Sequence, residues 1–414
     1  MADDSRTASG EPDARTSGQD APAASWPDQP STDYEFLEAA LAETGTEAFV
    51  HVGDRFDDDL RYLTRFSGPD RDYAFVFVGD AGDGDEPTTT LCAPALFEEQ
   101  AEREFPGDEV RMAGVGDPAG ERACTVLDDA LGGDGTVLVP QGIPHDAAVY
   151  LERGGYELRS TSAVADGRAV KTDEELDCLR RVQRATARGM ARAETILAES
   201  TPEGDELYWE GAPLSTERLR RQVNATLAGY GVRDAGNTVV GAGPSCADLH
   251  FTGIDDIAPG ETVLLDISPR GPHGYYGDLT RTFVVDGDGG WERRAYVAVE
   301  AAQRAAFDEL NAGAGVAAST VHEEAAAEIA AYGFSVGNEP GFTHGTGHGV
   351  GMSLHEAPSL RADDALQAGM VVTVEPGVYD STQGGVRIED LVVVTEDGYD
   401  VLAEYPTHIV PRKR

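Results

Sequence analysis

The chain has 414 residues, of which 40% are hydrophobic, and it carries a formal net charge of −43 at pH 7. This length exceeds the roughly 100 to 200 residues of one ordinary domain, and no apolar run approaches the roughly 18 residues of a membrane span. Because a charge of −43 repels nucleic acid phosphates and anionic lipids, we expect neither as a partner.

The charged residues are distributed in an unusual way. Lys171 and Lys413 are the only lysines among 32 basic residues, and the 75 acidic residues are spread through every segment. This pattern resembles the proteins of salt-accumulating haloarchaea. Molar salt shortens the electrostatic screening length to about 3 Å, so we expect high salt to stabilise the chain. A basic partner is the alternative explanation, but it predicts clustered acidic patches, which the sequence lacks.

Residues 1–30 are rich in Asp, Ser, Ala, Pro, Gly and Thr, and this composition predicts a disordered acidic tail. The tail lacks the basic start and the apolar run of a secretory signal, so we expect a cytoplasmic protein. The four cysteines are scattered and include no CxxC pair, which favours reduced structural thiols over a zinc site or a disulfide framework. They are Cys92, Cys124, Cys178 and Cys246.

Residues 31–169 show the pattern of an α/β domain. Short apolar runs at 48–50, 73–78 and 137–139 alternate with helical segments and with turns rich in Gly and Asp. His51 and His145 are the histidines of this segment, and we expect each to be a surface or core residue rather than a ligand.

The second domain, residues 170–414, begins with a long helix, because Thr172 and Glu175 form a capping box. A second helix is expected over 215–231. The segment 200–213 between them is either a substrate-facing loop or an exposed connector. Strands are then predicted at 262–267, 280–285, 371–374 and 391–395, with alanine-rich helices between the second and third strands. This order indicates an α+β domain with an antiparallel or mixed sheet and helices on one face.

Several residues that can bind metals stand at strand ends or in glycine-rich turns. Asp266 follows the apolar stretch 263–265, where a buried carboxylate is costly unless a cation compensates it. Asp278 follows twelve residues later. His344, His348 and His355 stand among glycines that allow the backbone to approach a ligand closely. Taken singly, each aspartate is an ordinary turn or cap residue, so the argument depends on the whole set.

Glu375 and Glu389 complete the set near the C-terminal end of the chain. Four carboxylates and one imidazole form a hard, oxygen-rich group that suits Mn, Co, Fe or Zn. Two ions fit this group better than one. Such ions lie roughly 3.5 to 4 Å apart and hold between them a water molecule acidic enough to attack at neutral pH.

Five segments resemble the pita-bread metallopeptidases, which include Xaa-Pro aminopeptidases, prolidases and methionine aminopeptidases. All five metal-ligand types match in order. The resemblance begins at about residue 34, because a creatinase-like domain also precedes the catalytic domain in the Xaa-Pro enzymes. It implies an α+β pita-bread catalytic domain behind a creatinase-like α/β domain. The segments are 237–251, 266–282, 344–358, 374–379 and 385–390.

The resemblance also implies roles for the five ligands. Asp266 would bind one metal ion, and Asp278 and Glu389 would bridge both ions. His348 and Glu375 would complete the other ion's ligands, and Glu375 would also shuttle a proton. The turn 268–277 is one residue longer than is usual in the family, an insertion that a loop absorbs when both strand ends are fixed.

Four further residues match the family on the substrate side. His250, His344 and His355 correspond to histidines that bind the scissile carbonyl and stabilise the oxyanion. Arg387 is expected to orient the ligands or to bind a carboxylate.

The implied function is an exopeptidase with two metal ions that cleaves Xaa-Pro bonds at the N-terminus of short peptides, as an aminopeptidase or as a dipeptidase. Manganese is the favoured ion, with Co, Zn or Fe as alternatives, and a homodimer is expected. A methionine aminopeptidase-like enzyme and a hydrolase of another small amide are the alternatives. An inactive binding module would lack some of the five ligands, and none is missing.

Overall fold

The computed structural model describes residues 25–79, 86–114 and 116–414. Its N-terminal part contains a six-stranded mixed sheet with the strand order β4-β3-β2-β1-β5-β6. The central strand β1 runs antiparallel to β2 and parallel to β5. These strands are β1 (Ala48–Gly53), β2 (Tyr73–Val78), β3 (Thr88–Pro94), β4 (Glu109–Ala113), β5 (Gly135–Pro140) and β6 (Tyr156–Thr161). The three apolar runs noted in the sequence of this segment lie in β1, β2 and β5, which confirms the expected α/β pattern.

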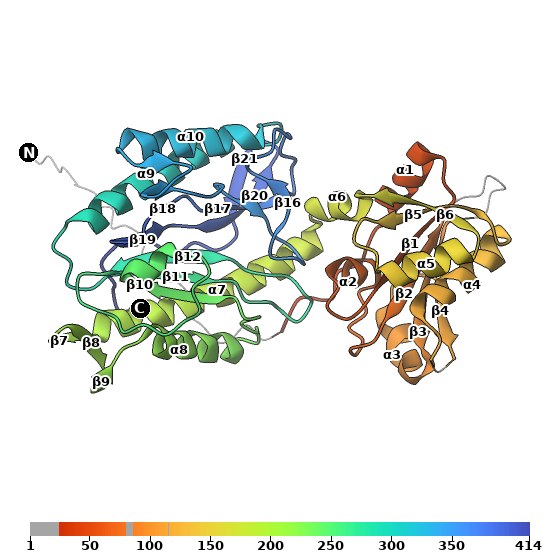
Figure 1. The fold of residues 1–414 in the computed structure, drawn as a ribbon, viewed down its shortest axis with the longest axis horizontal. Helices are drawn as coiled ribbons and strands as arrows, with labels where there is room; N and C mark the ends of the chain where they lie inside the picture. The colour runs from red at the N-terminus through yellow and green to blue at the C-terminus, as the bar shows by residue number, and fades with distance from the viewer. Residues whose placement is uncertain (1–24, 80–85, 115) are drawn as a thin grey trace, which may run out of the picture.

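Helices cover this sheet (Figure 1), and they are α1 (Glu35–Thr44), α2 (Asp58–Thr64), α3 (Glu98–Glu104), α4 (Ala119–Leu131), α5 (His145–Arg153) and α6 (Ala163–Ala169), with a 3-10 turn η1 (Ala95–Phe97). His51 is buried and lies 2.9 Å from Asp57 between Nε2 and Oδ1, whereas His145 is exposed. Both histidines are therefore the core or surface residues that the sequence predicts. All four cysteines are unpaired.

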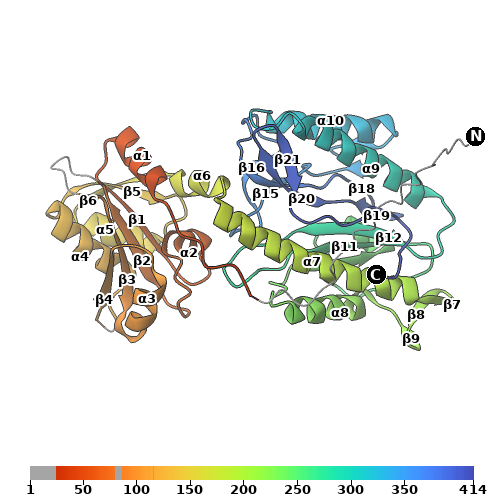
Figure 2. The ribbon, with the colours of Figure 1, turned by 180° about the vertical axis from the view of Figure 1, so that it is seen from behind.

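The long helix α7 (Asp173–Glu199) leads from the N-terminal domain into the second domain, as Figures 1 and 2 show. Its capping box is present, because the Thr172 hydroxyl accepts a hydrogen bond from the Glu175 amide and Glu175 accepts one from the Thr172 amide. The second helix, α8 (Thr216–Gly229), has Ser215 as its N-cap. Both helix predictions are confirmed.

Helix pairs flank the strands of the second domain from opposite sides (Figure 1). Helices α7 and α8 cover the antiparallel sheet of β10 (Thr238–Ala242), β11 (Thr262–Ile267) and β12 (Leu279–Val284), while α9 (Trp291–Leu310) and α10 (Ala318–Ala331) cover the second group of strands. That group contains β13 (Ser335–Val336), β14 (Gly341–Phe342), β15 (His348–Gly349), β16 (Glu356–Ser359), β17 (Val371–Val374), β18 (Gly377–Asp380), β19 (Gly384–Arg387), β20 (Asp390–Thr395) and β21 (Gly398–Val401). A 3-10 turn, η2 (Gly243–Ala247), follows β10. This is the pita-bread arrangement that the resemblance implies.

The segment 200–213 forms a small sheet of β7 (Thr201–Glu203), β8 (Glu206–Trp209) and β9 (Ala212–Pro213). Trp209 is buried there, and the guanidinium of Arg218 lies 4.8 Å from the centre of its ring.

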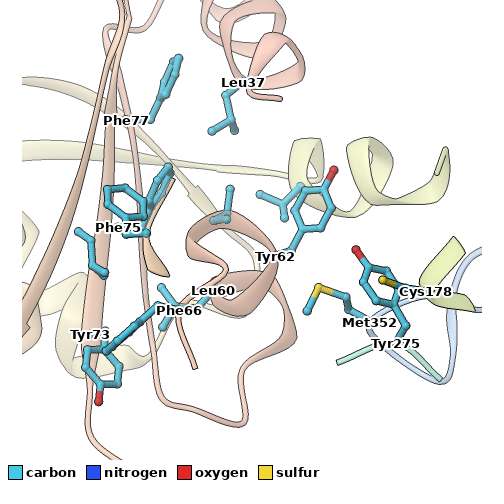
Figure 3. Packing of buried hydrophobic residues seen from close by; sticks show 14 of the residues in the cluster. Leu37, Leu60, Tyr62, Phe66, Tyr73, Phe75, Phe77, Cys178, Tyr275 and Met352 are labelled. Carbon is cyan, nitrogen blue, oxygen red and sulfur yellow. The ribbon is translucent and has the colours of Figure 1, made fainter. Parts of the chain in front are cut away.

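One apolar cluster joins the two domains. Tyr62 and Phe66 of the N-terminal domain belong to the same buried cluster as Cys178, Tyr275 and Met352 of the second domain (Figure 3). Burial of this apolar surface stabilises the contact between the domains. No helix in the described part of the chain is long and apolar enough to cross a membrane.

The first 24 residues of the expected tail lie outside the described residues. Its last part, residues 25–30, lies against the protein. The guanidinium of Arg181 is 4.5 Å from the centre of a Trp26 ring, and His273 Nε2 lies 2.9 Å from the carbonyl oxygen of Pro27. A tryptophan in an otherwise polar segment is the sequence feature that marks this contact.

Candidate metal centre and active site

A cavity of about 530 Å³ in the second domain brings the predicted site residues together. It is lined by all nine of them, namely His250, Asp266, Asp278, His344, His348, His355, Glu375, Arg387 and Glu389. None of the described residues that line it belongs to the segment 200–213.

The antiparallel strands β11 and β12 position the two aspartates. Asp266 lies in β11 opposite Thr280 of β12, and Asp278 directly precedes β12. The Ser268 hydroxyl lies within hydrogen-bond distance of both carboxylates, 3.3 Å from Asp266 Oδ1 and 3.0 Å from Asp278 Oδ1. The longer turn between the aspartates therefore still brings their side chains to one place.

Glu389 joins the two halves of the domain. Its amide donates a hydrogen bond to the Thr280 carbonyl at 3.1 Å, and the Thr280 hydroxyl donates to Glu389 Oε2 at 2.7 Å. Glu375 directly follows β17, and its amide donates to the Thr346 carbonyl at 2.7 Å. Backbone hydrogen bonds thus fix both glutamates beside the aspartates.

His348 has the form that binds a metal ion. Its Nδ1 lies 3.1 Å from the carbonyl oxygen of Gly349, which can only accept, so Nδ1 carries the proton and Nε2 carries the lone pair. Nε2 lies 3.5 Å from Glu375 Oε1 and 4.0 Å from Asp278 Oδ2. Burial, followed by the nearby His355, lowers the pKa of His348 to about 4, so the ring is neutral near pH 7.

The buried carboxylates repel one another. Burial and then the charge of Asp266 raise the pKa of Asp278 well above its ordinary value, and burial followed by Asp278 does the same for Glu389. Burial raises the pKa of Glu375 to about 8. Arg387 donates to Asp266 Oδ2 at 2.6 Å, but one guanidinium does not balance four carboxylates.

These donors fit divalent metal ions. One donor atom each from Asp278, His348 and Glu389 lies within 4.8 Å of the others. A nearby cation strongly stabilises the ionised form of buried carboxylates whose pKa values are raised. Hard oxygen donors together with one imidazole suit Mn, Fe, Co or Zn.

Tyr379 is a further residue of the site, beyond the nine predicted from the sequence. Its hydroxyl is 2.8 Å from His344 Nε2, and Arg387 Nη1 donates to it at 3.0 Å. His344 Nδ1 lies 2.7 Å from the carbonyl oxygen of Gly345 and must donate, so Nε2 accepts from Tyr379. Burial, followed by Arg387, lowers the pKa of His344 to about 3. Both ring nitrogens of His344 are thus engaged within the protein, an arrangement that differs from the expected direct contact with substrate.

The accessible side of the cavity carries His250, His355 and Arg361, which are exposed. The ring of His355 lies 4.3 Å from that of His348 between centroids. Arg361 forms no ion pair within the described chain, unlike the buried Arg387. Arg361 lies outside the five segments that resemble the family, and Tyr379 ends the segment 374–379 without matching a ligand or a substrate-side residue.

Comparison with known proteins identifies the family. The sequence model of metallopeptidase family M24 matches residues 177–396, which is more than half of the chain. The chain belongs to this family. A probable dipeptidase, PepE, of Mycobacterium tuberculosis is 33% identical over 248 residues, which are 59% of this chain and 61% of that protein. An Xaa-Pro dipeptidase of Pyrococcus furiosus is 31% identical over 57% of this chain and 63% of that protein.

These sequence matches span about three fifths of the length of the relatives. Among solved structures, a prolidase from Pyrococcus horikoshii covers 91% of this M24 chain and 99% of its own, with a TM-score of 0.75 and 22% identity. That likeness shows the fold, with an N-terminal α/β domain before the pita-bread domain.

Proposed function

We propose that this M24 metallopeptidase is a dipeptidase that hydrolyses Xaa-Pro dipeptides. The observation that carries this proposal is the exposed guanidinium of Arg361, which lines the same cavity as the metal donors. A dipeptide has a free carboxylate one residue beyond its scissile bond, and a guanidinium binds a carboxylate through two charge-assisted hydrogen bonds. The preference for proline is supported by the relatives and by the N-terminal domain.

We assign two divalent metal ions to five residues, with Asp278 and Glu389 bridging, Asp266 on one ion, and His348 with Glu375 on the other. The neutral His348 ring and the mutual repulsion of the carboxylates support this assignment. Manganese is favoured, with Co, Zn or Fe as alternatives. Bound ions would supply Lewis acidity, lowering the pKa of a water molecule and polarising the scissile carbonyl.

The residues of the chain would divide the remaining chemistry. His355 is accessible, and burial followed by His250 lowers its pKa, so its neutral ring can donate a hydrogen bond to the oxygen that becomes negative. Glu375 lines the cavity, and its Oε1 lies 3.5 Å from His348 Nε2, so its carboxylate is placed to pass a proton from the attacking water to the leaving nitrogen. His344 would act through Tyr379 and Arg387.

The test compares an Xaa-Pro dipeptide, the same dipeptide with an amidated C-terminus, an Xaa-Pro-Xaa tripeptide and a Met-Ala peptide. Replacing Arg361 by Ala should raise KM for the free dipeptide about tenfold or more, because a hydrogen bond to a charged group is lost. The same replacement should change KM for the amidated dipeptide much less, because that substrate has no free carboxylate. Arg304→Ala is the control, since Arg304 is an exposed arginine paired with Glu300 outside the cavity.

The other outcomes separate the alternatives. If the wild type prefers the tripeptide and Arg361→Ala leaves every KM unchanged, the enzyme is an Xaa-Pro aminopeptidase. Release of Met would indicate a methionine aminopeptidase-like enzyme. If metals bind and no peptide is cleaved, another small amide or a binding role would replace the proposal.

We include in the proposal a homodimer, a cytoplasmic location, adaptation to high salt of the haloarchaeal type, and a domain boundary between residues 169 and 170. The boundary is supported by the end of α6 at Ala169 and the start of α7 at Asp173.

A further inference from the structure

Helix α2 of the N-terminal domain contacts two loops that connect site residues. The first loop, 268–277, connects Asp266 to Asp278, and the second, 349–354, connects His348 to His355. No residue of α2 is among those that line the cavity. Any effect of α2 on the reaction is therefore indirect.

The carboxylate of Asp58, at the start of α2, joins the two loops directly. Its Oδ1 accepts a hydrogen bond from Arg270 Nη2 at 2.5 Å, and its Oδ2 accepts one from Ser353 Oγ at 2.8 Å. Arg270 belongs to the first loop and Ser353 to the second. The Arg270 side chain is 10% exposed and that of Asp58 is 24% exposed, so solvent screens this pair less than a surface ion pair.

Ser353 and Glu356, which stand on either side of His355, are held by basic side chains close to the domain boundary. Arg168 donates to Ser353 Oγ at 2.7 Å and to Glu356 Oε2 at 2.6 Å, and Lys171 donates to Glu356 Oε1 at 2.6 Å. His355 itself is exposed and lies in an irregular segment. Its position therefore depends on how firmly Ser353 and Glu356 are held.

A second set of contacts fixes the loops to each other and to α2. The Tyr276 amide donates to the Gly351 carbonyl at 2.9 Å, and Arg65, at the end of α2, donates to the Tyr275 hydroxyl at 2.6 Å. Tyr275 and Met352 belong to the apolar cluster that also contains Tyr62 of α2 (Figure 3). Both loops therefore pack against α2 and the adjacent Arg65 in the N-terminal domain.

We propose that Asp58 is a positioning residue for the peptidase reaction. It fixes the loop that carries His355 relative to the turn between Asp266 and Asp278, so the N-terminal domain sets the geometry of the active site within its own chain. This role differs from closing the cleft around substrate or supporting oligomers. It rests on the proposed function, in which His355 contacts the reacting carbonyl.

The kinetic test uses Asp58→Asn, Ser353→Ala and the double variant. Asparagine cannot accept both hydrogen bonds, and Ser353→Ala removes one of them with less risk to folding. Each variant should lower kcat about 10- to 100-fold, since small misplacement of a catalytic group has costs of this order. KM should change much less, and metal stoichiometry should not change. The kcat of the double variant should be no lower than that of the more impaired single variant, because both changes break the hydrogen bond between Asp58 and Ser353.

Asp134→Asn is the matched control. It makes the same charge change at an exposed position of the N-terminal domain, between α4 and β5, and should leave kcat unchanged. Unchanged kcat in Asp58→Asn and Ser353→Ala would overturn the proposal. Independent, multiplicative losses in the double variant would also overturn it.

Hydrogen exchange separates this proposal from the proposed function. In Asp58→Asn, amide exchange should become faster in both 268–277 and 349–356, with little change elsewhere in the second domain. This result would support the positioning role even if the wild type cleaved no Xaa-Pro peptide. Unchanged exchange in both loops would overturn it whatever the substrate.

Discussion

The hydroxyl of Thr280 donates a hydrogen bond to Glu389, with 2.7 Å between Oγ1 and Oε2, and both residues are buried. Thr280 lies in β12 and Glu389 directly precedes β20, so this bond orients a carboxylate of one half of the domain from the other half. Such a hydrogen bond should strengthen metal binding, because a carboxylate that is already oriented loses less rotational freedom when it binds the ion.

Thr280→Val tests that relationship. Valine has nearly the same shape and lacks the hydroxyl, so we expect metal affinity to fall by about 10- to 100-fold, the usual cost of losing a partner behind a ligand. Isothermal titration with Mn²⁺ measures the change. Thr88→Val, at an exposed position of β3, is the control and should bind the metal like the wild type. Equal affinities in all three proteins would mean that Thr280 does not orient Glu389.

The metal-free protein should become less stable as the pH rises. Burial raises the pKa of Glu375 to about 8, and burial with neighbouring carboxylates raises the pKa values of Asp278 and Glu389. A group with a raised folded-state pKa contributes stability that is fully present below its unfolded pKa, near 4, and is lost as the pH rises through the folded value.

Metal binding should show the opposite dependence, because metal ions must displace protons from these carboxylates. The difference in Tm between the metal-loaded and metal-free proteins should therefore grow between pH 5 and about pH 8, the upper limit set by the pKa of Glu375. When the two forms are compared at the same pH and salt concentration, repulsion among the other charges of the chain contributes equally to both Tm values and drops out of the difference. A constant difference in Tm would contradict the assignment of these carboxylates as ligands.

Tyr379→Phe should destabilise the protein. The change leaves Arg387 Nη1 and His344 Nε2 without their shared buried partner, which costs about 1–3 kcal/mol of unfolding free energy. Tyr296→Phe is a matched control, because the Tyr296 hydroxyl is buried and has no hydrogen-bond partner in the described part of the chain. Denaturant unfolding should show the loss for Tyr379 and little change or a gain for Tyr296. Equal effects would show that the hydrogen bonds of Tyr379 do not stabilise the site.

The sequence predicted local features well. The strand 262–267 and the capping box at Thr172 agree with the structure, since each depends on neighbouring residues. The strand predicted at 280–285 lies at Leu279–Val284, one residue earlier, because Leu279 pairs with Ile267 across the ribbon. The pattern of apolar and polar residues within one strand does not fix its register with the neighbouring strand, and the register decides where the pairing begins.

Contacts between distant segments could not be predicted in this way. Asp58 and Arg270 are 212 positions apart, and nothing in either segment marks the other as its partner. The nine predicted site residues are spread over positions 250 to 389, but the order of their residue types resembles a known family. Arg361 has no comparable pattern, and the role of Tyr379 behind His344 is visible only in the folded chain.

The final prediction concerns the net charge of −43. Like charges spread over one folded surface repel each other, and unfolding moves them apart, so salt should favour the folded state. The screening length falls from about 10 Å at 0.1 M salt to about 3 Å at 1 M, and repulsion between neighbouring surface carboxylates is largely removed over this range. We therefore expect Tm to rise steeply up to about 1 M KCl and more slowly above it.

Calorimetry in 0.1, 1 and 3 M KCl measures this effect, and sucrose of equal osmolality is the control, because sucrose stabilises proteins through exclusion without screening charge. A rise in KCl that clearly exceeds the rise in sucrose would support screening as the cause. If Tm in molar KCl were no higher than in dilute buffer, the spread of acidic residues would need a different explanation. If sucrose raised Tm as much as KCl, the benefit would come from exclusion rather than from reduced repulsion among carboxylates.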